Sequence, residues 1–229
     1  MAAIPKEMKF PVYVWEAPVR LWHWVMALAM VVLAVSGYLI GSPLRTVPGE
    51  ASENYVLGYV RFAHFAAAYV FAVSLVGRAY WALVGNRYAR EIFAVPFFML
   101  KPAFWGRIWR VQLHYLFIRD NPDVHVGHNA LAMAAMFFMF VLGSVFMVFT
   151  GFAMYGEGKG AGTWANTVFT SWMAPLAGNT QNLHTWHHLG MWYLVVFILV
   201  HLYFVFREDM LSGFTVLGSM IDGYRARKG

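Results

Sequence analysis

The stretch Leu183-His184-Thr185-Trp186-His187-His188-Leu189-Gly190 opens an apolar run that continues to Val205 and contains His201. His187 and His201 are 14 residues apart, which on an α-helix is about four turns and roughly 21 Å of rise. At about 100° per residue, this spacing returns both imidazoles to within roughly 40° of one face. The run is about long enough to cross a hydrocarbon core of roughly 30 Å. The sequence therefore predicts a membrane helix, about residues 183–206, with one imidazole near each surface.

The composition is that of an integral membrane protein. Of the 229 residues, 60% are hydrophobic and 12% are charged, and the mean hydropathy is +0.54; an average soluble domain has about 25% charged residues. The chain has no cysteine. This excludes a cysteine-ligated iron–sulfur cluster, a covalently attached c-type haem, a thiolate zinc site and any disulfide. Histidine is therefore the strong metal-ligand type that the chain offers in number.

Three further apolar runs are long enough to span a membrane, about residues 19–40, 57–84 and 129–155. The first is too long for the apolar region of a signal peptide, and no small-residue cleavage site follows it promptly, so we expect it to be retained. With residues 183–206, these runs predict an all-α integral membrane protein: one domain, residues 1–229, built as a four-helix bundle. A basic segment, residues 85–125, contains tryptophans and suits an amphipathic stretch at the membrane surface.

The basic residues divide unevenly between the two sides of these four runs. If the N-terminus is inside, 14 of the 17 Lys and Arg residues lie in inner segments or flanks, and three, Arg45, Arg61 and Lys159, lie in outer ones. Positive charge collects on the cytoplasmic side of membrane proteins. We therefore expect both termini to be cytoplasmic. The same asymmetry explains the sequence pI near 9.6 better than nucleic-acid binding does.

In this topology the histidines of the spans pair by depth. His23 lies at the inner end of the first run, and His64 lies at the outer start of the second. His187 lies near the outer surface and His201 near the inner one. The sequence therefore predicts an outer pair, His64 with His187, and an inner pair, His23 with His201, stacked between the helices of the bundle.

Haem b fits such pairs better than zinc does. Zinc takes three or four protein ligands, whereas low-spin haem takes two axial ligands and an apolar slot. His184 lies on the same stripe one turn nearer the outer surface and is the alternative outer ligand, while His188 points about 140° away from the face of His201. Arg20 and Arg61 are candidates for contacts with haem propionates, or they mark the membrane boundary.

Glycines inside the apolar runs have two interpretations. They let a haem approach the backbone, or they let two helices pack closely. The residues concerned are Gly37, Gly77, Gly143, Gly151 and Gly190.

Short motifs spread over the whole chain point to one family. They are Glu16-Ala17-Pro18-Val19-Arg20-Leu21-Trp22-His23-Trp24, Gly85-Asn86-Arg87-Tyr88, Gly127-His128-Asn129, His184-Thr185-Trp186-His187-His188-Leu189-Gly190-Met191-Trp192, Arg207-Glu208-Asp209 and Gly223-Tyr224-Arg225. Each is weak alone. Together they resemble the b-type cytochrome subunit of membrane-bound uptake NiFe-hydrogenases.

The resemblance implies a four-helix di-haem cytochrome of the bacterial cytoplasmic membrane, related to the membrane subunit of respiratory formate dehydrogenase. In that family the first and fourth helices hold one haem, and the second and fourth hold the other. His23, His64, His187 and His201 fall at the family's ligand positions. This agrees with the pairing by depth.

The resemblance also implies the partners and the direction of electron flow. The partners are a periplasmic large subunit with the Ni–Fe centre and a small iron–sulfur subunit. Electrons from hydrogen pass to the outer haem, to the inner haem and then to a membrane quinone. Relatives place the quinone near the inner haem, beside an asparagine that is Asn129 here, next to His128. An asparagine that caps a helix looks the same in sequence.

The spans contain no nucleophile–base pair and no acid–base carboxylate pair. The chain is therefore expected to be an electron-transfer subunit of an oxidoreductase without a hydrogen-splitting site of its own. Two alternatives remain open from the sequence. One is the cytochrome b subunit of another periplasmic dehydrogenase, such as formate dehydrogenase. The other is a transporter without haem whose path is lined by histidine.

Overall fold

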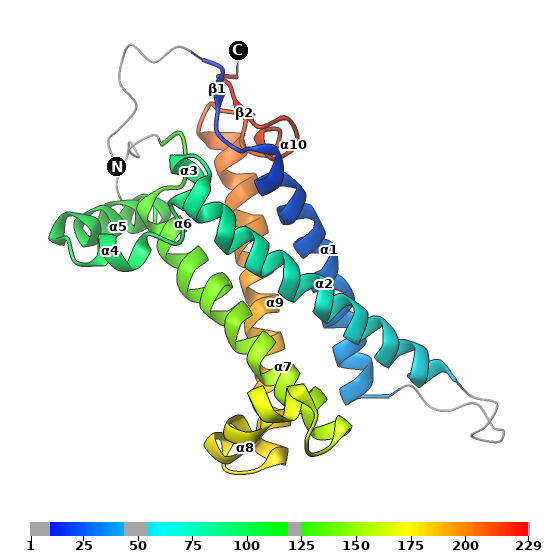
Figure 1. Cartoon of the computed structure of the whole chain (residues 1–229). Coiled ribbons are helices and arrows are strands. Elements are labelled where there is room, and N and C mark those ends of the chain that lie inside the picture. The colour runs from blue at the N-terminus through cyan, green and yellow to red at the C-terminus, as the bar shows by residue number, and fades with distance from the viewer. Residues whose placement is uncertain (1–9, 44–54, 119–124, 229) are drawn as a thin grey trace. The chain divides into compact units, whose positions relative to one another are not determined.

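A computed structural model describes residues 10–43, 55–118 and 125–228. Its long helices are α1 (Ala17–Gly41), α2 (Val56–Val84) and α9 (Thr180–Leu211), together with the continuous stretch Ala130–Lys159 (Figure 1). Within the described residues, these four are long and apolar enough to cross a membrane. The prediction of a mostly helical chain with four helices able to span a membrane is confirmed.

Helix α9 extends beyond the predicted apolar run at both ends, to Thr180 and to Leu211. Hydropathy marks only the part that hydrocarbon can solvate, whereas a helix can continue into the polar interface. At its start, Asn179 Oδ1 accepts a hydrogen bond from the backbone N–H of Asn182 at 2.8 Å. This bond satisfies one of the free N–H groups of the first turn.

The third span consists of three segments, α6 (Ala130–Ala135), the π-helix η2 (Met136–Leu142) and α7 (Gly143–Lys159). Asn129 caps α6, because its side chain accepts from the backbone N–H of Ala132 at 2.8 Å. A π-helix within an α-helix adds a residue to the turn and rotates the side chains that follow. The uniformly apolar sequence of this span gives no sign of it.

Three short helices occupy the basic segment: α3 (Arg87–Arg90), α4 (Val95–Met99) and α5 (Pro102–Tyr115). Helix α5 has an amphipathic pattern, since Phe104 and Val111 are buried while Trp105 and Trp109 are exposed. The buried Phe104 belongs to a cluster that joins α4, α5 and α6. Contact of this segment with a membrane surface stays a prediction. Some basic residues used for orientation, Lys6, Lys9, Arg45 and Arg119, lie outside the described residues.

The chain forms two compact units. Unit 1 comprises Met1–His23, Gly77–Val141 and Ile198–Gly229, and unit 2 comprises Trp24–Val76 and Leu142–Phe197. Helices α1, α2 and α9 each contribute residues to both units. The core cluster of unit 1 consists of Val14, Trp15, Val19, Tyr88, Ala89 and Val126. The cluster of unit 2 consists of Ala153, Met173, Ala177 and Leu183.

Short elements complete each unit. In unit 1, β1 (Val12–Tyr13) pairs antiparallel with β2 (Tyr224–Arg225), with Val12 opposite Arg225. The turn before β2 contains α10 (Ser219–Asp222). In unit 2, the π-helix η3 (Asn166–Thr170) and α8 (Ser171–Ala177) connect α7 to α9.

Candidate functional site

Unit 2 brings together two of the predicted histidines. His64 lies on α2 and His187 lies on α9. Their ring centres are 6.5 Å apart, with an angle of 71° between the ring planes. Both side chains are at least half-buried among apolar helices.

Unit 1 contains the other two. His23 lies on α1 and His201 lies on α9. Their ring centres are 6.4 Å apart, with an angle of 50° between the ring planes. Each of the two units thus contains one pair of imidazoles, and the two separations agree to within 0.1 Å.

These separations suit a metal held between two imidazoles. A metal–imidazole bond is about 2 Å, so two rings that bind one metal from opposite sides have centres about 6 Å apart. Among the described residues, no group of three or more His, Cys, Asp or Glu side chains can hold a metal ion. Two ligands for each metal fit the axial positions of haem and do not fit zinc, which takes three or four.

A hydroxyl group meets each imidazole of the unit 2 pair. Ser36 Oγ, on α1, lies 2.9 Å from His64 Nδ1. Thr150 Oγ1, on α7, lies 2.8 Å from His187 Nδ1. Ser36 is 5% exposed and Thr150 is fully buried. Neither residue was predicted from the sequence, where the available signal was a hydroxyl residue directly before a glycine in an otherwise apolar helix.

Two of the five glycines in the spans face these imidazoles. A Cβ added to Gly37 would lie 3.3 Å from His64 Cε1, and one added to Gly151 would lie 3.2 Å from His187 Cε1. The other three face side chains other than histidine: Gly77 faces Trp22, Gly143 faces Leu194 and Tyr193, and Gly190 faces Met147 and Phe146. Close helix packing therefore accounts for these three.

The other two histidines near the start of α9 have different neighbours. His184 is exposed, and its Nε2 lies 3.6 Å from Glu157 Oε2. His188 Nε2 accepts a hydrogen bond from Trp192 Nε1 at 3.2 Å. Both contacts involve Nε2, whereas His187 is the histidine whose ring centre lies 6.5 Å from that of His64.

The two arginines proposed for propionate contacts lie in different settings. Arg20 is partly buried near the start of α1 and donates a hydrogen bond to the backbone carbonyl of Ile221. Arg61 is exposed near the start of α2. The carbonyl bond gives Arg20 a structural role within unit 1.

Asn129 has protein partners for both ends of its amide. Its oxygen caps α6, and its Nδ2 donates to the hydroxyl of Tyr115 at 2.9 Å. Tyr115 stacks on Phe204 with ring centres 4.6 Å apart, and Arg207 lies over the same ring. Burial of Tyr115 raises the pKa of its phenol to about 12. The tyrosine therefore stays protonated and neutral at physiological pH.

His128 lies beside a buried carboxylate. Its backbone N–H donates to Glu91 Oε2 at 2.9 Å, and its Nδ1 lies 3.3 Å from the same oxygen. Glu91 is 5% exposed. A Cβ added to Gly127 would come within 2.8 Å of three Glu91 carboxylate atoms. The Glu91 carboxylate therefore leaves no room for a side chain at Gly127 and bonds the backbone of His128.

The motif residues Glu16 and Asn86 tie the start of α1 to the end of α2. Glu16 Oε2 accepts from Trp81 Nε1 at 2.9 Å and from the backbone N–H of Asn86 at 2.8 Å. Asn86 Nδ2 in turn donates to the carbonyl of Val14 at 3.0 Å. We call this set the Glu16 clamp. It gives two of the sequence motifs a structural role.

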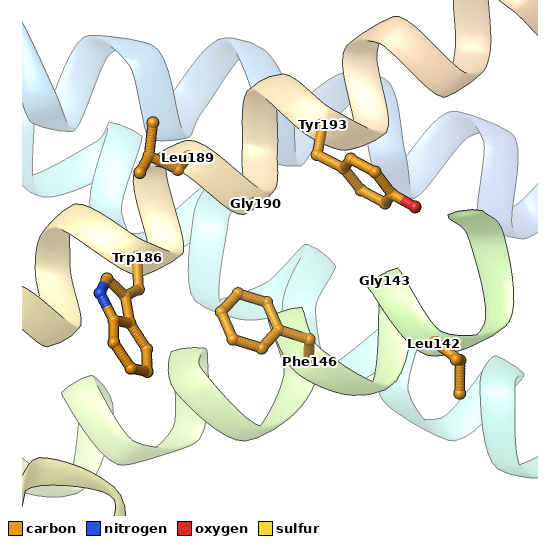
Figure 2. A pocket seen from close by; sticks show the side chains of 7 residues that line it. All are labelled: Leu142, Gly143, Phe146, Trp186, Leu189, Gly190 and Tyr193. Atoms are coloured by element: carbon orange, nitrogen blue, oxygen red, sulfur yellow. The ribbon is translucent and has the colours of Figure 1, made fainter. Parts of the chain in front are cut away.

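An open apolar groove of about 520 Å³ lies between α7 and α9 in unit 2 (Figure 2). Its lining is Leu142, Gly143, Phe146, Trp186, Leu189, Gly190 and Tyr193. None of the paired histidines lines it. The groove is therefore distinct from the imidazole pairs.

Comparisons with known proteins agree with the motifs. A family model described as prokaryotic cytochrome b561 matches residues 14–223. The probable Ni/Fe-hydrogenase B-type cytochrome subunit of Cupriavidus necator is 55% identical over 216 residues, which cover 94% of this chain and 87% of that protein. That of Azotobacter chroococcum is 54% identical, covering 95% and 89%. The hydrogenase 1 subunit of Escherichia coli K12 is 46% identical, covering 94% and 91%. The family resemblance predicted from the motifs is confirmed.

Proposed function

We propose that this chain, which belongs to the prokaryotic cytochrome b561 family, binds two haem b groups and carries electrons from a NiFe-hydrogenase to the membrane quinone pool. The observation that carries the proposal is the presence of two imidazole pairs, with ring centres 6.5 Å apart in His64/His187 and 6.4 Å apart in His23/His201. The hydrogenase partner is supported by the names of relatives at 46% and 55% identity.

Bound haem would supply the one-electron chemistry, and the protein supplies the ligands and the surroundings. Each histidine offers one ring nitrogen to iron. The apolar helices around the pairs exclude water, so a bound haem would lie in surroundings of low polarity. Two centres in one bundle give electrons a route through the hydrocarbon layer, which a single centre near one surface does not provide.

The charge distribution supports a direction for this route. We place both termini in the cytoplasm of a bacterium, because 14 of the 17 Lys and Arg residues then lie on the inner side. The pair His64/His187 is then the outer one, nearest to the periplasm. The partner that meets it there is the iron–sulfur small subunit of the hydrogenase, which connects the chain to the large subunit.

The electrons leave at the inner side, where a quinone accepts them together with protons. His128 lies there beside the buried Glu91, and Asn129 Nδ2, which gives one hydrogen to Tyr115, has a second hydrogen to donate. Asn129→Ser separates the two roles of that residue, because serine keeps the helix cap but removes the amide. We expect slower quinone reduction with an unchanged haem spectrum. Unchanged turnover would restrict Asn129 to capping.

Optical spectra of the purified complex test the haem sites. Reduced-minus-oxidised spectra of the native chain should contain two b-type components. His64→Ala and His187→Ala should remove the same component, and His23→Ala and His201→Ala should remove the other. His188→Ala is the matched control, because this histidine is adjacent to His187 but is bonded to Trp192. A native complex without haem, or histidine variants with unchanged spectra, would contradict the proposal.

Purification through a tag on this chain tests the partner. We expect the hydrogenase subunits to co-purify and hydrogen to reduce the haem. Recovery of formate dehydrogenase subunits, with reduction by formate alone, would replace the hydrogenase with the alternative partner. A chain that lacks a Soret band and carries a solute across vesicle membranes would instead be a transporter.

A further inference from the structure

The imidazole of His64 lies against two consecutive residues of α1. Ser36 Oγ lies 2.9 Å from His64 Nδ1. A Cβ on the next residue, Gly37, would lie 3.3 Å from His64 Cε1, so the ring lies directly against the bare backbone. We call such a pair, a hydroxyl residue followed by glycine, a hydroxyl–glycine notch.

The imidazole of His187 lies in a second notch, on α7. Thr150 Oγ1 lies 2.8 Å from His187 Nδ1, and a Cβ on Gly151 would lie 3.2 Å from His187 Cε1. The same two ring atoms, Nδ1 and Cε1, therefore meet the same two kinds of residue in both notches. Two different helices build this arrangement, which makes a chance contact a poor explanation.

The hydrogen atoms of the hydroxyl groups fix the direction of these bonds. A hydroxyl has one hydrogen to donate. Ser36 Oγ donates it to the carbonyl of Val32 at 2.5 Å, and Thr150 Oγ1 donates it to the carbonyl of Phe146 at 2.8 Å. This bond to the preceding turn is common for Ser and Thr in helices. With its hydrogen on that carbonyl, the hydroxyl oxygen accepts, which favours the tautomer whose Nδ1–H donates to it.

A neutral imidazole carries its single hydrogen on one nitrogen and a lone pair on the other. When Nδ1 carries the hydrogen, Nε2 keeps the lone pair that a metal requires. Donation from Nδ1–H also fixes the ring orientation and makes the ligand more basic. A more basic ligand stabilises ferric iron relative to ferrous iron and lowers the reduction potential.

We propose that the notches Ser36–Gly37 and Thr150–Gly151 hold His64 and His187 with Nε2 directed to the haem iron, and that they lower the reduction potential of that haem. Ser36 and Thr150 are thus positioning residues that act through the ligands. The inference rests on the proposed ligation of haem by His64 and His187.

Redox titration of the full complex tests this inference. The variants are Ser36→Ala and Thr150→Val, the second of which keeps the shape of the side chain. Each should raise the midpoint potential of the component that His64→Ala removes, and leave the other component unchanged. Ser36→Thr and Thr150→Ser, which keep the hydroxyl, should restore the native potential. Thr185→Ala is the matched control, because its hydroxyl donates to the carbonyl of Gln181 on the same helix as His187.

Electron paramagnetic resonance of the oxidised complex gives a second readout, since a freed ring changes its orientation and the g-values of one haem. Selective loss of this haem, reversed by the hydroxyl-keeping variants, also supports the inference. Both haems bound with native potentials and g-values in Ser36→Ala and Thr150→Val would overturn it. That outcome leaves the ligation intact, whereas a native complex without haem would overturn the ligation itself.

Discussion

The two histidine pairs have nearly the same separation, but the described contacts around them differ. In unit 2, contacts act on the rings themselves, through the hydroxyl–glycine notches. In unit 1, no described glycine has His23 or His201 among the atoms nearest to its added Cβ. The described contacts near this pair include Trp22 packed on Gly77, beside His23, and the Glu16 clamp at the start of α1. Two imidazole pairs of similar separation thus lie beside different kinds of described contact.

Loss of a contact to a ring and loss of a contact to a helix should have different effects. Removal of a ring contact leaves the helices in place and changes one ligand. Removal of a helix contact changes the position of every side chain on that segment. We therefore expect the loss of a ring contact in unit 2 to alter the signature of one haem with little loss of stability, and substitutions in unit 1 to alter stability as well.

The largest effect is expected from filling a notch. Gly151→Leu places a branched side chain where a single Cβ would already lie 3.2 Å from His187 Cε1. Overpacking of this kind costs about 1–3 kcal/mol in a rigid interior, and here the ligand must move. We expect the haem content of the purified chain to fall to about half, measured as pyridine haemochrome. Gly158→Leu is the matched control on α7, because nothing lies within 4 Å of its added Cβ. Equal haem content in the two variants would contradict the idea that the notch contacts act on the ring of His187.

The next effect is expected in unit 1. A Cβ at Gly77 would lie 3.0 Å from the indole of Trp22, so Gly77→Ala displaces the ring next to His23. We expect changed g-values and a shifted midpoint potential for the component that His23→Ala removes. Gly58→Ala, also on α2, is the control, because its added Cβ lies in open space. A change in the other component instead would show that helix contacts do not act locally.

The apolar runs predicted four helices able to span a membrane, because hydropathy and helical period are local properties of the sequence. The spacing of the histidines gave the two pairs whose ring centres lie 6.5 Å and 6.4 Å apart, and their role as ligands stays a prediction. His188 points about 140° from the face of His201 on the helix, and the structure places its Nε2 against Trp192 Nε1.

The notches could not be predicted in the same way. Ser36 meets His64 from α1, and Thr150 meets His187 from α7. Such contacts depend on which helices pack together and on their rotation, which no single helix specifies. The π-helix Met136–Leu142 is a further feature that the uniformly apolar sequence of its span does not specify.

A smaller effect is expected from the Glu16 clamp. Glu16→Ala leaves the indole N–H of Trp81 and the backbone N–H of Asn86 without their acceptor. An unsatisfied buried donor costs roughly 1–3 kcal/mol. The haem component that His23→Ala removes should therefore be lost at a lower temperature than in the native chain. Glu16→Gln keeps an acceptor oxygen and should lose less. Thermal loss of the two haem components, followed optically, checks the order. Simultaneous loss in all variants would mean that the clamp supports both units.

The smallest effect is expected at Tyr115, because its one described hydrogen bond comes from Asn129, whose amide oxygen still caps α6. Tyr115→Phe removes the acceptor and keeps the stacking on Phe204, so we expect a loss of only about 1 kcal/mol. The pH dependence is more informative. Burial disfavours the phenolate and raises the pKa of Tyr115 to about 12, whereas the pKa of an exposed tyrosine is about 10. Native and Tyr115→Phe chains should therefore show the same phenolate absorbance up to about pH 11. If the native chain shows one more phenolate than Tyr115→Phe below that pH, water reaches Tyr115. The packing at the start of α6 would then be looser than the packing around the Glu16 clamp in the same unit.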